Sequence, residues 1–368
     1  MKTVQRLLYA EILQAVIFVA CGFLALFVFF DLVEELQNLT KLADNGYRLQ
    51  HGLIQVALKL PGHLYDLFPI SVLIGCIFVM ARLAQSSEFT ILRTGGLDPQ
   101  RALLLLLKLG CGFVLLTFVL GDYIAPWTER HATLLKSQFR GAITTGQTGA
   151  WLKERSPQRH SAVNVKAMDK HAEMKGIRIH QFNQQGELQT IIQADRGTFG
   201  EGLWHLSDVE QQTFTVAGTK ASEHLQILKL ATVQWSTGIT ADMVDAALLR
   251  PDQMKTWDLF LYTRHLSSNN QNAQQYEIQL WRKVFYPLSC LVMMTLALPF
   301  AYLHFRSGQI AGHVFGGVMA GISFYLLNNI FGHIGNLQNW VPWLTSAAPS
   351  LIYTFISLVA FAWMVHTR

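Results

Sequence analysis

The sequence predicts an α-helical membrane protein with six membrane-spanning helices and one inserted all-β domain. Hydrophobic residues make up 51% of the 368 positions and charged residues only 14%, a balance that soluble chains of this length do not show. Long uncharged runs occupy both ends of the chain, and a polar segment with strand-like alternation separates them. We therefore expect the chain to cross a membrane on each side of a β-rich insertion.

The first three spans precede the polar segment. Residues 12–30 carry no charge over 19 positions, about 28 Å of helix, which is enough to cross the hydrocarbon core. The second span is centred on residues 67–81 and extends back through Pro69 and Pro61 as a kinked, partly interfacial segment. The third span runs from about residue 102 to 121.

The last three spans follow the polar segment. Residues 284–305 are predicted to form the fourth. After Arg306 no Asp, Glu, Lys or Arg occurs until Arg368, and this stretch is long enough for two spans separated by turn-forming residues near 336–342. All four cysteines fall within predicted spans, so we expect the polar segment to fold without disulfides. They are Cys21, Cys76, Cys111 and Cys290.

Basic residues in the short loops set the predicted orientation, because they favour the cytoplasmic face. The residues that mark this face are Lys2, Arg6, Arg82, Arg93, Arg101, Arg306 and Arg368. Both termini are therefore predicted to be cytoplasmic, with the polar segment on the other side. Residues 1–30 are interpreted as an uncleaved anchor, since the apolar run is long and lacks a cleavage site of small residues.

The polar segment, residues 127–275, is predicted to form a β-sandwich or jelly roll after an amphipathic stretch at 128–143. Residues 250–266 are interpreted as a short helix that returns the chain to the membrane. The segment holds 16 Lys or Arg and 14 Asp or Glu, and a net charge of +2 does not indicate a nucleic-acid surface. The apolar residues expected to face inward are Ile177, Ile179, Phe182, Ile191, Phe199 and Trp204.

Common catalytic and nucleotide-binding motifs are absent from the sequence. No G-x-x-x-x-G-K-[ST], H-E-x-x-H, C-x-x-C or G-x-S-x-G pattern occurs. We therefore expect neither an enzyme active site nor a metal or cofactor site in this chain. Any work that the protein does is expected to draw its energy from elsewhere.

Residues 86–96 are predicted to form a short polar helix between the second and third spans. It begins at a Ser pair with Glu88 in the first turn and ends at a Gly pair. Phe89 and Leu92 share one face, which suits entry into a groove on a cytosolic partner. An ordinary solvated loop with a capping carboxylate is the alternative, and the local pattern alone favours it, because capped short helices are common.

Six segments carry a resemblance to the lipopolysaccharide export permease family, LptF and LptG. These segments are DLVEEL at 31–36, LAQSSEFTILRTGGL at 83–97, GDYIAPWTE at 121–129, GLWHLSDV at 202–209, LRPDQM at 249–254 and LWRKVFYPLSCLVMMTLALPFAYLHFRSG at 280–308. The resemblance covers essentially the whole chain. No single segment is decisive, but their order is specific.

The resemblance implies a permease half of an ABC transporter in the bacterial inner membrane, with lipopolysaccharide as its substrate. It implies pairing with a homologous half such as LptF, with a dimer of the cytosolic ATPase LptB that binds the ATP, and with LptC and the periplasmic bridge protein LptA. Residues 1–126 would hold the first three helices, residues 127–275 a periplasmic β-jellyroll with connecting helices, and residues 276–368 the last three helices. Residues 86–96 would be the coupling helix, where Glu88, Phe89, Leu92 and Arg93 contact the ATPase.

A glycolipid with acyl chains and phosphates needs an apolar cavity topped by cations, which are tolerated at the outer rim because water is close. The basic candidates near the outer span ends are Lys41, Arg48, Lys59, Arg130 and Lys136. Lys136 matches a basic position in relatives; the others follow from location, and a surface charge is the alternative for each. Relatives often carry basic residues where this chain has Asp31 and Gly62, so the charge contacts are expected to shift toward Lys59 and Lys41.

Small residues recur along the fifth span and allow close helix approach, either within the chain or against a partner. The family architecture favours the subunit interface, and the residues predicted there are Gly308, Gly312, Gly316, Gly317 and Gly321. Besides the permease hypothesis, two other classes stay open. One is a non-transporting membrane scaffold or sensor with a periplasmic β domain, and the other is a lipid-modifying enzyme, for which the sequence offers no catalytic constellation.

Overall fold

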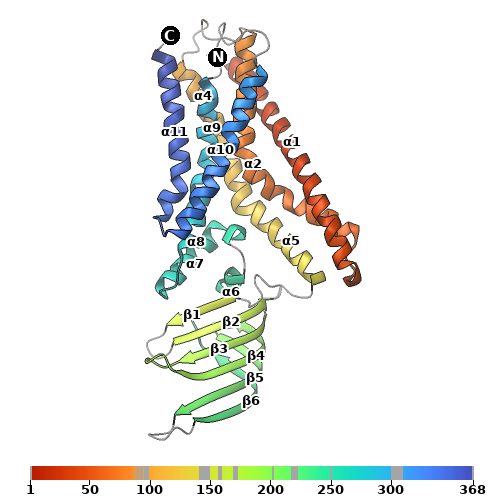
Figure 1. Cartoon of the computed structure of the whole chain (residues 1–368), viewed down its shortest axis with the longest axis vertical. Helices are drawn as coiled ribbons and strands as arrows, with labels where there is room; N and C mark the ends of the chain where they lie inside the picture. The colour runs from red at the N-terminus through yellow and green to blue at the C-terminus, as the bar shows by residue number, and fades with distance from the viewer. Residues whose placement is uncertain are drawn as a thin grey trace. The chain divides into compact units, whose positions relative to one another are not determined.

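The structure is a computed structural model, and it describes residues 2–86, 88, 91, 94, 99–140, 150–155, 160–168, 173–200, 203–216, 223–248, 251–299 and 310–366. The chain divides into two compact units. The first unit, Met1–Ala132 with Glu277–Arg368, is helical, and the second, Thr133–Tyr276, contains the β-strands (Figure 1).

The helical elements begin and end as follows. They are α1 Lys2–Leu42, the 3-10 turn η1 Ala43–Asn45, α2 Leu49–Gln85, α4 Pro99–Val119, the π-helical turn η2 Leu120–Ile124, α5 Ala125–Arg140, α8 Gln274–Phe285, the 3-10 turn η4 Tyr286–Leu288, α9 Ser289–Ala297, α10 Ile310–Leu337 and α11 Pro342–His366. Pro61 and Pro69 lie inside α2, so the predicted interfacial segment and second span form one helix.

Five helical stretches in the described part of the chain are long and apolar enough to cross a membrane. They are Gln5–Leu42, Leu49–Gln85, Gln100–Lys136, Val314–Leu337 and Pro342–Trp363. They correspond to the first, second, third, fifth and sixth predicted spans. The fourth, 284–305, is described only as far as residue 299, where α9 provides a buried helical segment, so a count of six stays a prediction.

Helix α2 is the centre of the helical unit. It packs against α1, α9 and α10, and most of its apolar window is buried. Gly75 allows a close approach to α1, because a Cβ atom there would lie 2.8 Å from the backbone nitrogen of Val16. The α1–α2 crossing therefore depends on a missing side chain.

The second unit contains one six-stranded antiparallel sheet in which strands follow each other in sequence order. The strands are β1 Ala150–Arg155, β2 His160–Met168, β3 Met174–Phe182, β4 Leu188–Gly200, β5 Leu203–Val216 and β6 Glu223–Trp235. Three helical elements follow them, α6 Ala241–Leu248, η3 Pro251–Gln253 and α7 Thr256–Ser268. The β-rich insertion is confirmed at this level, whereas the jellyroll stays a prediction.

Strand pairing is interrupted along one line that crosses the sheet from β2 to β6. One residue in each strand is skipped by the register, and we name these residues the interrupted row. They are Lys166, Gly176, Asp195, Asp208 and Ala231. Gly176 has φ +63° and Asp208 has φ 55°, so two of the five leave the extended conformation altogether.

The interrupted row shifts which residues face the core. On β3, Met174 and Ile177 are both buried although they lie three residues apart, and on β5 the same holds for Leu206 and Val209. A Cβ at Gly197 would meet side chains of Met174, Ile177 and Leu206 together, which places all of them on one face. Apolar residues on both sides of the row thus share one core, although strict alternation would put them on opposite faces.

Three of the predicted inward residues, Ile177, Ile179 and Trp204, are buried. The prediction that Ile191 faces inward is wrong, because its neighbour Ile192 is the buried residue. Phe182 is half-buried, whereas Phe199 is exposed, so the prediction that Phe199 belongs to the buried set is wrong. The indole N–H of Trp204 donates to the carbonyl of Ile239 at 2.8 Å, which anchors the segment that follows β6.

The two edges of the sheet differ. The carboxylate of Glu154 on the β1 edge accepts hydrogen bonds from the hydroxyl of Thr237 and the N–H of Gly238, and α6 packs on β1 and β2. The β6 edge is longer and displays apolar side chains, with Leu228 44% and Leu230 39% exposed. The inner face of the sheet is therefore less covered beside β6 than beside β1.

We expect Gly75→Ala to lower the free energy of unfolding by about 1–3 kcal/mol, because the new methyl group meets backbone atoms that cannot rotate away. Thermal unfolding of the full chain in detergent, followed by tryptophan fluorescence, measures the effect. Gly22→Ala on α1 is the matched control, since a Cβ there has no neighbour within 4 Å in the part of the chain that the structure describes. Equal midpoints for the two variants would contradict the close-approach role of Gly75.

Candidate functional site

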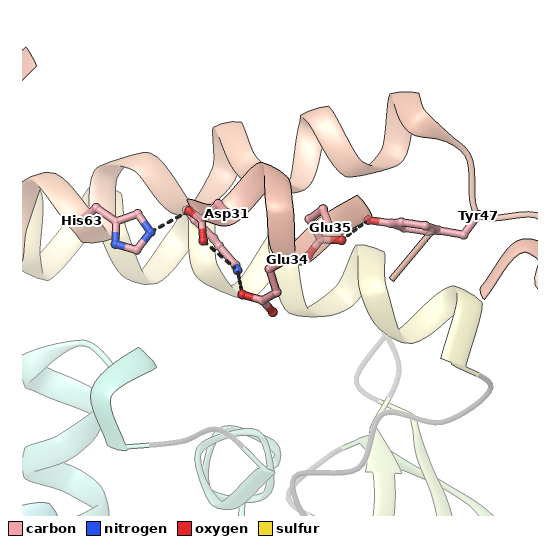
Figure 2. Close-up of polar contacts among 6 residues, drawn as sticks. Asp31, Glu34, Glu35, Tyr47 and His63 are labelled. Carbon is pink, nitrogen blue, oxygen red and sulfur yellow. Dashed lines mark hydrogen bonds and ion pairs between the residues drawn. The ribbon is translucent and has the colours of Figure 1, made fainter. Parts of the chain in front are cut away.

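A network of charged and polar side chains joins α1 and α2 near the turn between them (Figure 2). Asp31, Glu34 and Glu35 come from the last third of α1, and Lys59 and His63 come from α2. The spacing of three or four residues places each set on one side of its helix. Two apolar helices thus meet through a polar patch, which we name the hairpin network.

Asp31 is the centre of the hairpin network. Lys59 donates from Nζ to its Oδ1 at 3.3 Å, and His63 Nε2 lies 2.8 Å from its Oδ2. Because the carboxylate only accepts, His63 donates through Nε2. Lys59 also contacts Glu34 Oε2 at 3.5 Å. The side chain of Asp31 is 10% exposed and that of Lys59 26%, so both charges are largely removed from solvent.

Glu35 and Tyr47 close the end of the helix pair. The Tyr47 hydroxyl donates to Glu35 Oε2 at 2.9 Å, and both side chains are buried. Glu35 packs against α2 as well, since a Cβ placed on Gly52 would lie 3.7 Å from the Cβ of Glu35. These contacts fix the turn between α1 and α2.

Lys59 is a weak candidate for capturing an anion directly. Its ammonium lies against two carboxylates, so an incoming phosphate would have to displace Asp31 or Glu34. Glu34 is 58% exposed and its contact is the longer of the two, which makes it the easier partner to displace. Gly62 lies one turn away with Glu129 Oε1 directly over it, so α5 adds another carboxylate near this part of α2.

The other predicted cations lie elsewhere on their helices. Lys41 is exposed in the last turn of α1, and Arg48 is exposed immediately before the start of α2. Arg130 is exposed on α5, and Lys136 is half-buried further along the same helix. The structure thus brings Lys59 into the hairpin network, whereas the part that the other four play in binding stays a prediction.

Glu88 is helical and exposed, and Ile91, one turn further on, is also exposed. Thr94 bonds back to the carbonyl of Ile91 at 3.0 Å, as expected for a helical turn. Phe89, Leu92 and Arg93, which are predicted to act beside Glu88, lie outside the described residues. The contact with an ATPase stays a prediction.

The glycines of the fifth span separate into two groups. A Cβ at Gly317 would meet Ile77, and one at Gly321 would meet Ile70, so both glycines serve packing against α2. A Cβ at Gly312 or Gly316 would meet no atom within 4 Å among the described residues, so these two leave a smooth surface on α10. Gly308 lies outside the described residues. The second group is the part of the stripe available to another helix.

Sequence reasoning missed the partners within the hairpin network. Glu34, Glu35, Tyr47 and His63 were not predicted as site residues, although the spacing of 31, 34 and 35 on one helix and of 59 and 63 on the next indicates two polar stripes. The missing information was the rotation of each helix about its axis. Two stripes can face each other or face apart, and only packing decides.

Comparisons with known proteins agree over nearly the whole chain. The family described as "Lipopolysaccharide export system permease LptF/LptG" matches residues 6–363. The chain is 28% identical over 333 residues to the lipopolysaccharide export system permease protein LptG of Escherichia coli K12, with 89% of each chain covered. It is 26% identical over 371 residues to the protein of the same name from Haemophilus influenzae, covering 100% of this chain and 99% of the relative.

We expect Asp31→Asn to lower the free energy of unfolding by about 1–3 kcal/mol, because it leaves the largely buried Lys59 without its main counter-charge. Glu34→Gln is the matched control, since the same change at a more exposed carboxylate should cost less than about 1 kcal/mol. Thermal unfolding in detergent compares the two. A larger loss for Glu34→Gln would contradict the central place of Asp31.

Proposed function

The chain belongs to the lipopolysaccharide export system permease LptF/LptG family, and from this we propose that it is the LptG-type half of a transporter that extracts lipopolysaccharide from the inner membrane. It would pass the lipid to a periplasmic bridge for export to the outer membrane. The observation that carries the proposal is the family match over residues 6–363, which includes both the helical unit and the sheet.

The proposed arrangement in the membrane has six spans, with both termini in the cytoplasm and the β domain in the periplasm. Residues 1–126 and 276–368 are assigned to the membrane domain and residues 127–275 to the periplasmic domain. Basic residues in the short loops support the orientation. The interrupted row supports a jellyroll, because a transverse break lets one hydrogen-bonded sheet bend around a single core.

The energy for extraction is proposed to come from a separate ATPase dimer of the LptB type, which binds the ATP, so this chain needs no nucleotide cofactor of its own. Glu88 supports this part of the proposal, because an exposed carboxylate on a short helix between two spans can take part in an ion pair with a cytosolic partner. A homologous half of the LptF type, LptC and the bridge protein LptA complete the proposed set of partners. Gly312 and Gly316 offer a surface for close approach by the homologous half.

The phosphates of the lipid are proposed to meet cations at the outer ends of the spans. Exposure favours Lys41 and Arg48 for a first contact. Lys59 would contact a phosphate only after the phosphate displaces the Glu34 carboxylate, since the Lys59 ammonium already lies against two carboxylates. Arg130 and Lys136 extend the basic set along α5.

We expect Glu88→Lys to leave the protein in the membrane and to lower recovery of the ATPase with the tagged chain by at least about tenfold, because it reverses the charge of an interface group. Export of lipopolysaccharide should be lost with it. Co-purification after mild detergent extraction and a depletion–complementation growth assay measure the two effects.

The matched control is Glu187→Lys, the same charge reversal on an exposed turn of the sheet, which should leave both readouts unchanged. Normal export with Glu88→Lys would exclude the coupling role. If the unaltered chain recovers neither an ATPase nor a homologous permease half, the proposed function itself is wrong, and a scaffold or sensor becomes the better hypothesis.

A lipid path along the inner face of the sheet predicts directional photo-crosslinking. A photoreactive amino acid at Leu228 or Leu230 should cross-link to lipopolysaccharide, because these side chains pair with the inward positions Gln211 and Val209. The same group at Lys229, which lies between them on the opposite face, should not. Equal yields from all three positions would oppose a path along this face.

A further inference from the structure

A proline interrupts the long helix that leads from the third span toward the β-strands. Pro126 lacks an N–H, and in a regular α-helix its ring would crowd the carbonyl of Asp122, four residues earlier. The chain forms the π-helical turn Leu120–Ile124 two residues before it, and the N–H of the intervening Ala125 donates to the carbonyl of Leu120, five residues back. The wider turn gives the proline ring room without ending the helix.

The π-turn removes the usual donors for one carbonyl, that of Gly121. The donor four residues on, Ala125, is bonded to Leu120, and the residue five positions on is Pro126, which has no N–H. Such a carbonyl is costly at the edge of an apolar region unless a side chain replaces the missing donor. Lys283 provides one, because its Nζ donates to the Gly121 oxygen at 3.0 Å and the residue is only 8% exposed.

Aromatic and polar side chains pack closely around the contact between Lys283 and Gly121. Gly121 has no room for a side chain, because the ring of Tyr65 lies where its Cβ would be. Tyr65 packs against Tyr286 with ring centroids 5.0 Å apart, and the Tyr286 hydroxyl donates to the carbonyl of Asp66 at 2.5 Å. The residue before Lys283, Arg282, donates to Asn329 Oδ1 on α10 at 2.7 Å. Two adjacent basic residues of α8 therefore bind two different helical segments.

The contact between Lys283 and Gly121 joins the two connecting segments on either side of the polar insertion. The π-turn directly precedes α5, by which the chain leaves the third span, and Lys283 lies on α8, by which the chain returns to α9. We propose that Lys283 is a positioning residue for transport that ties these two connections together, so that movement of one is passed to the other. The inference rests on the proposed function. A cation suits this role, since a charge-assisted bond to a carbonyl is stronger than a neutral one.

The test uses the full chain in its co-purified complex, reconstituted in lipid nanodiscs. Lys283→Met should raise hydrogen exchange of the amides in residues 118–128 and lower lipopolysaccharide released per ATP by about tenfold, while ATP hydrolysis changes less than about twofold. Lys283→Arg should restore most of the release, because a guanidinium also donates. Lys108→Met, which removes an exposed lysine from α4, is the matched control and should change neither readout.

A second-site variant distinguishes the loss of the hydrogen bond to the Gly121 carbonyl from a loss of side-chain packing. Pro126→Ala restores an N–H, so the turn can return to α-helical pairing and Gly121 regains a backbone donor. Pro126→Ala combined with Lys283→Met should therefore recover normal exchange and assembly, even if Lys283→Met alone assembles poorly. Failure of this rescue would overturn the proposal.

The two readouts also distinguish the possible failures. Unchanged hydrogen exchange in Lys283→Met would show that the contact does not hold the turn and would overturn the proposal. Altered exchange with unchanged release per ATP would remove the role in transport and overturn it equally. If the unaltered complex releases no lipopolysaccharide, the proposed function fails, and the transport role of Lys283 falls with it while the exchange result still reports on the turn.

Discussion

Backbone hydrogen bonding in an apolar medium is the constraint on which the helical unit depends. Where the helix is regular, each carbonyl finds its donor four residues on, and the sequence needs only apolar side chains. Where Pro126 breaks this pattern, the chain forms a wide turn in which Gly121 admits the ring of Tyr65 and its carbonyl accepts a hydrogen bond from the ammonium of Lys283. The missing N–H of Pro126 thus accounts for a hydrogen bond between two residues that lie more than 150 positions apart in the sequence.

The sheet meets a related requirement by different means. Strand residues alternate between faces, so a core that continues past a bend needs a shift of one position. The interrupted row supplies that shift in every strand from β2 to β6, with Gly176 and Asp208 at positive φ. The apolar residues on its two sides can then share one interior.

The sequence predicts the features of this protein that depend on composition, but not the residue faces and contacts that depend on packing. Apolar runs locate five described spans, because length and hydrophobicity alone select helices in a membrane. The prediction that Ile191 faces the core is wrong, because alternation alone does not say which of two adjacent isoleucines is buried. The sequence predicts Lys59 as a cation for phosphate but not its carboxylate partners, because the rotation of a helix about its axis cannot be derived from residue spacing. The glycines of α10 show the same limit, since the stripe is visible in the sequence but its division between α2 and an open surface is not.

The unequal edges of the sheet give it a polarity. The β1 edge is six residues long and is engaged by the segment after β6, whereas β6 offers 13 residues flanked by apolar side chains. A strand from another molecule would find its longest run of backbone donors and acceptors beside β6. Any series of such sheets joined by their edges would therefore have a head and a tail, and its direction would be set by the order in which one chain lays down its own strands.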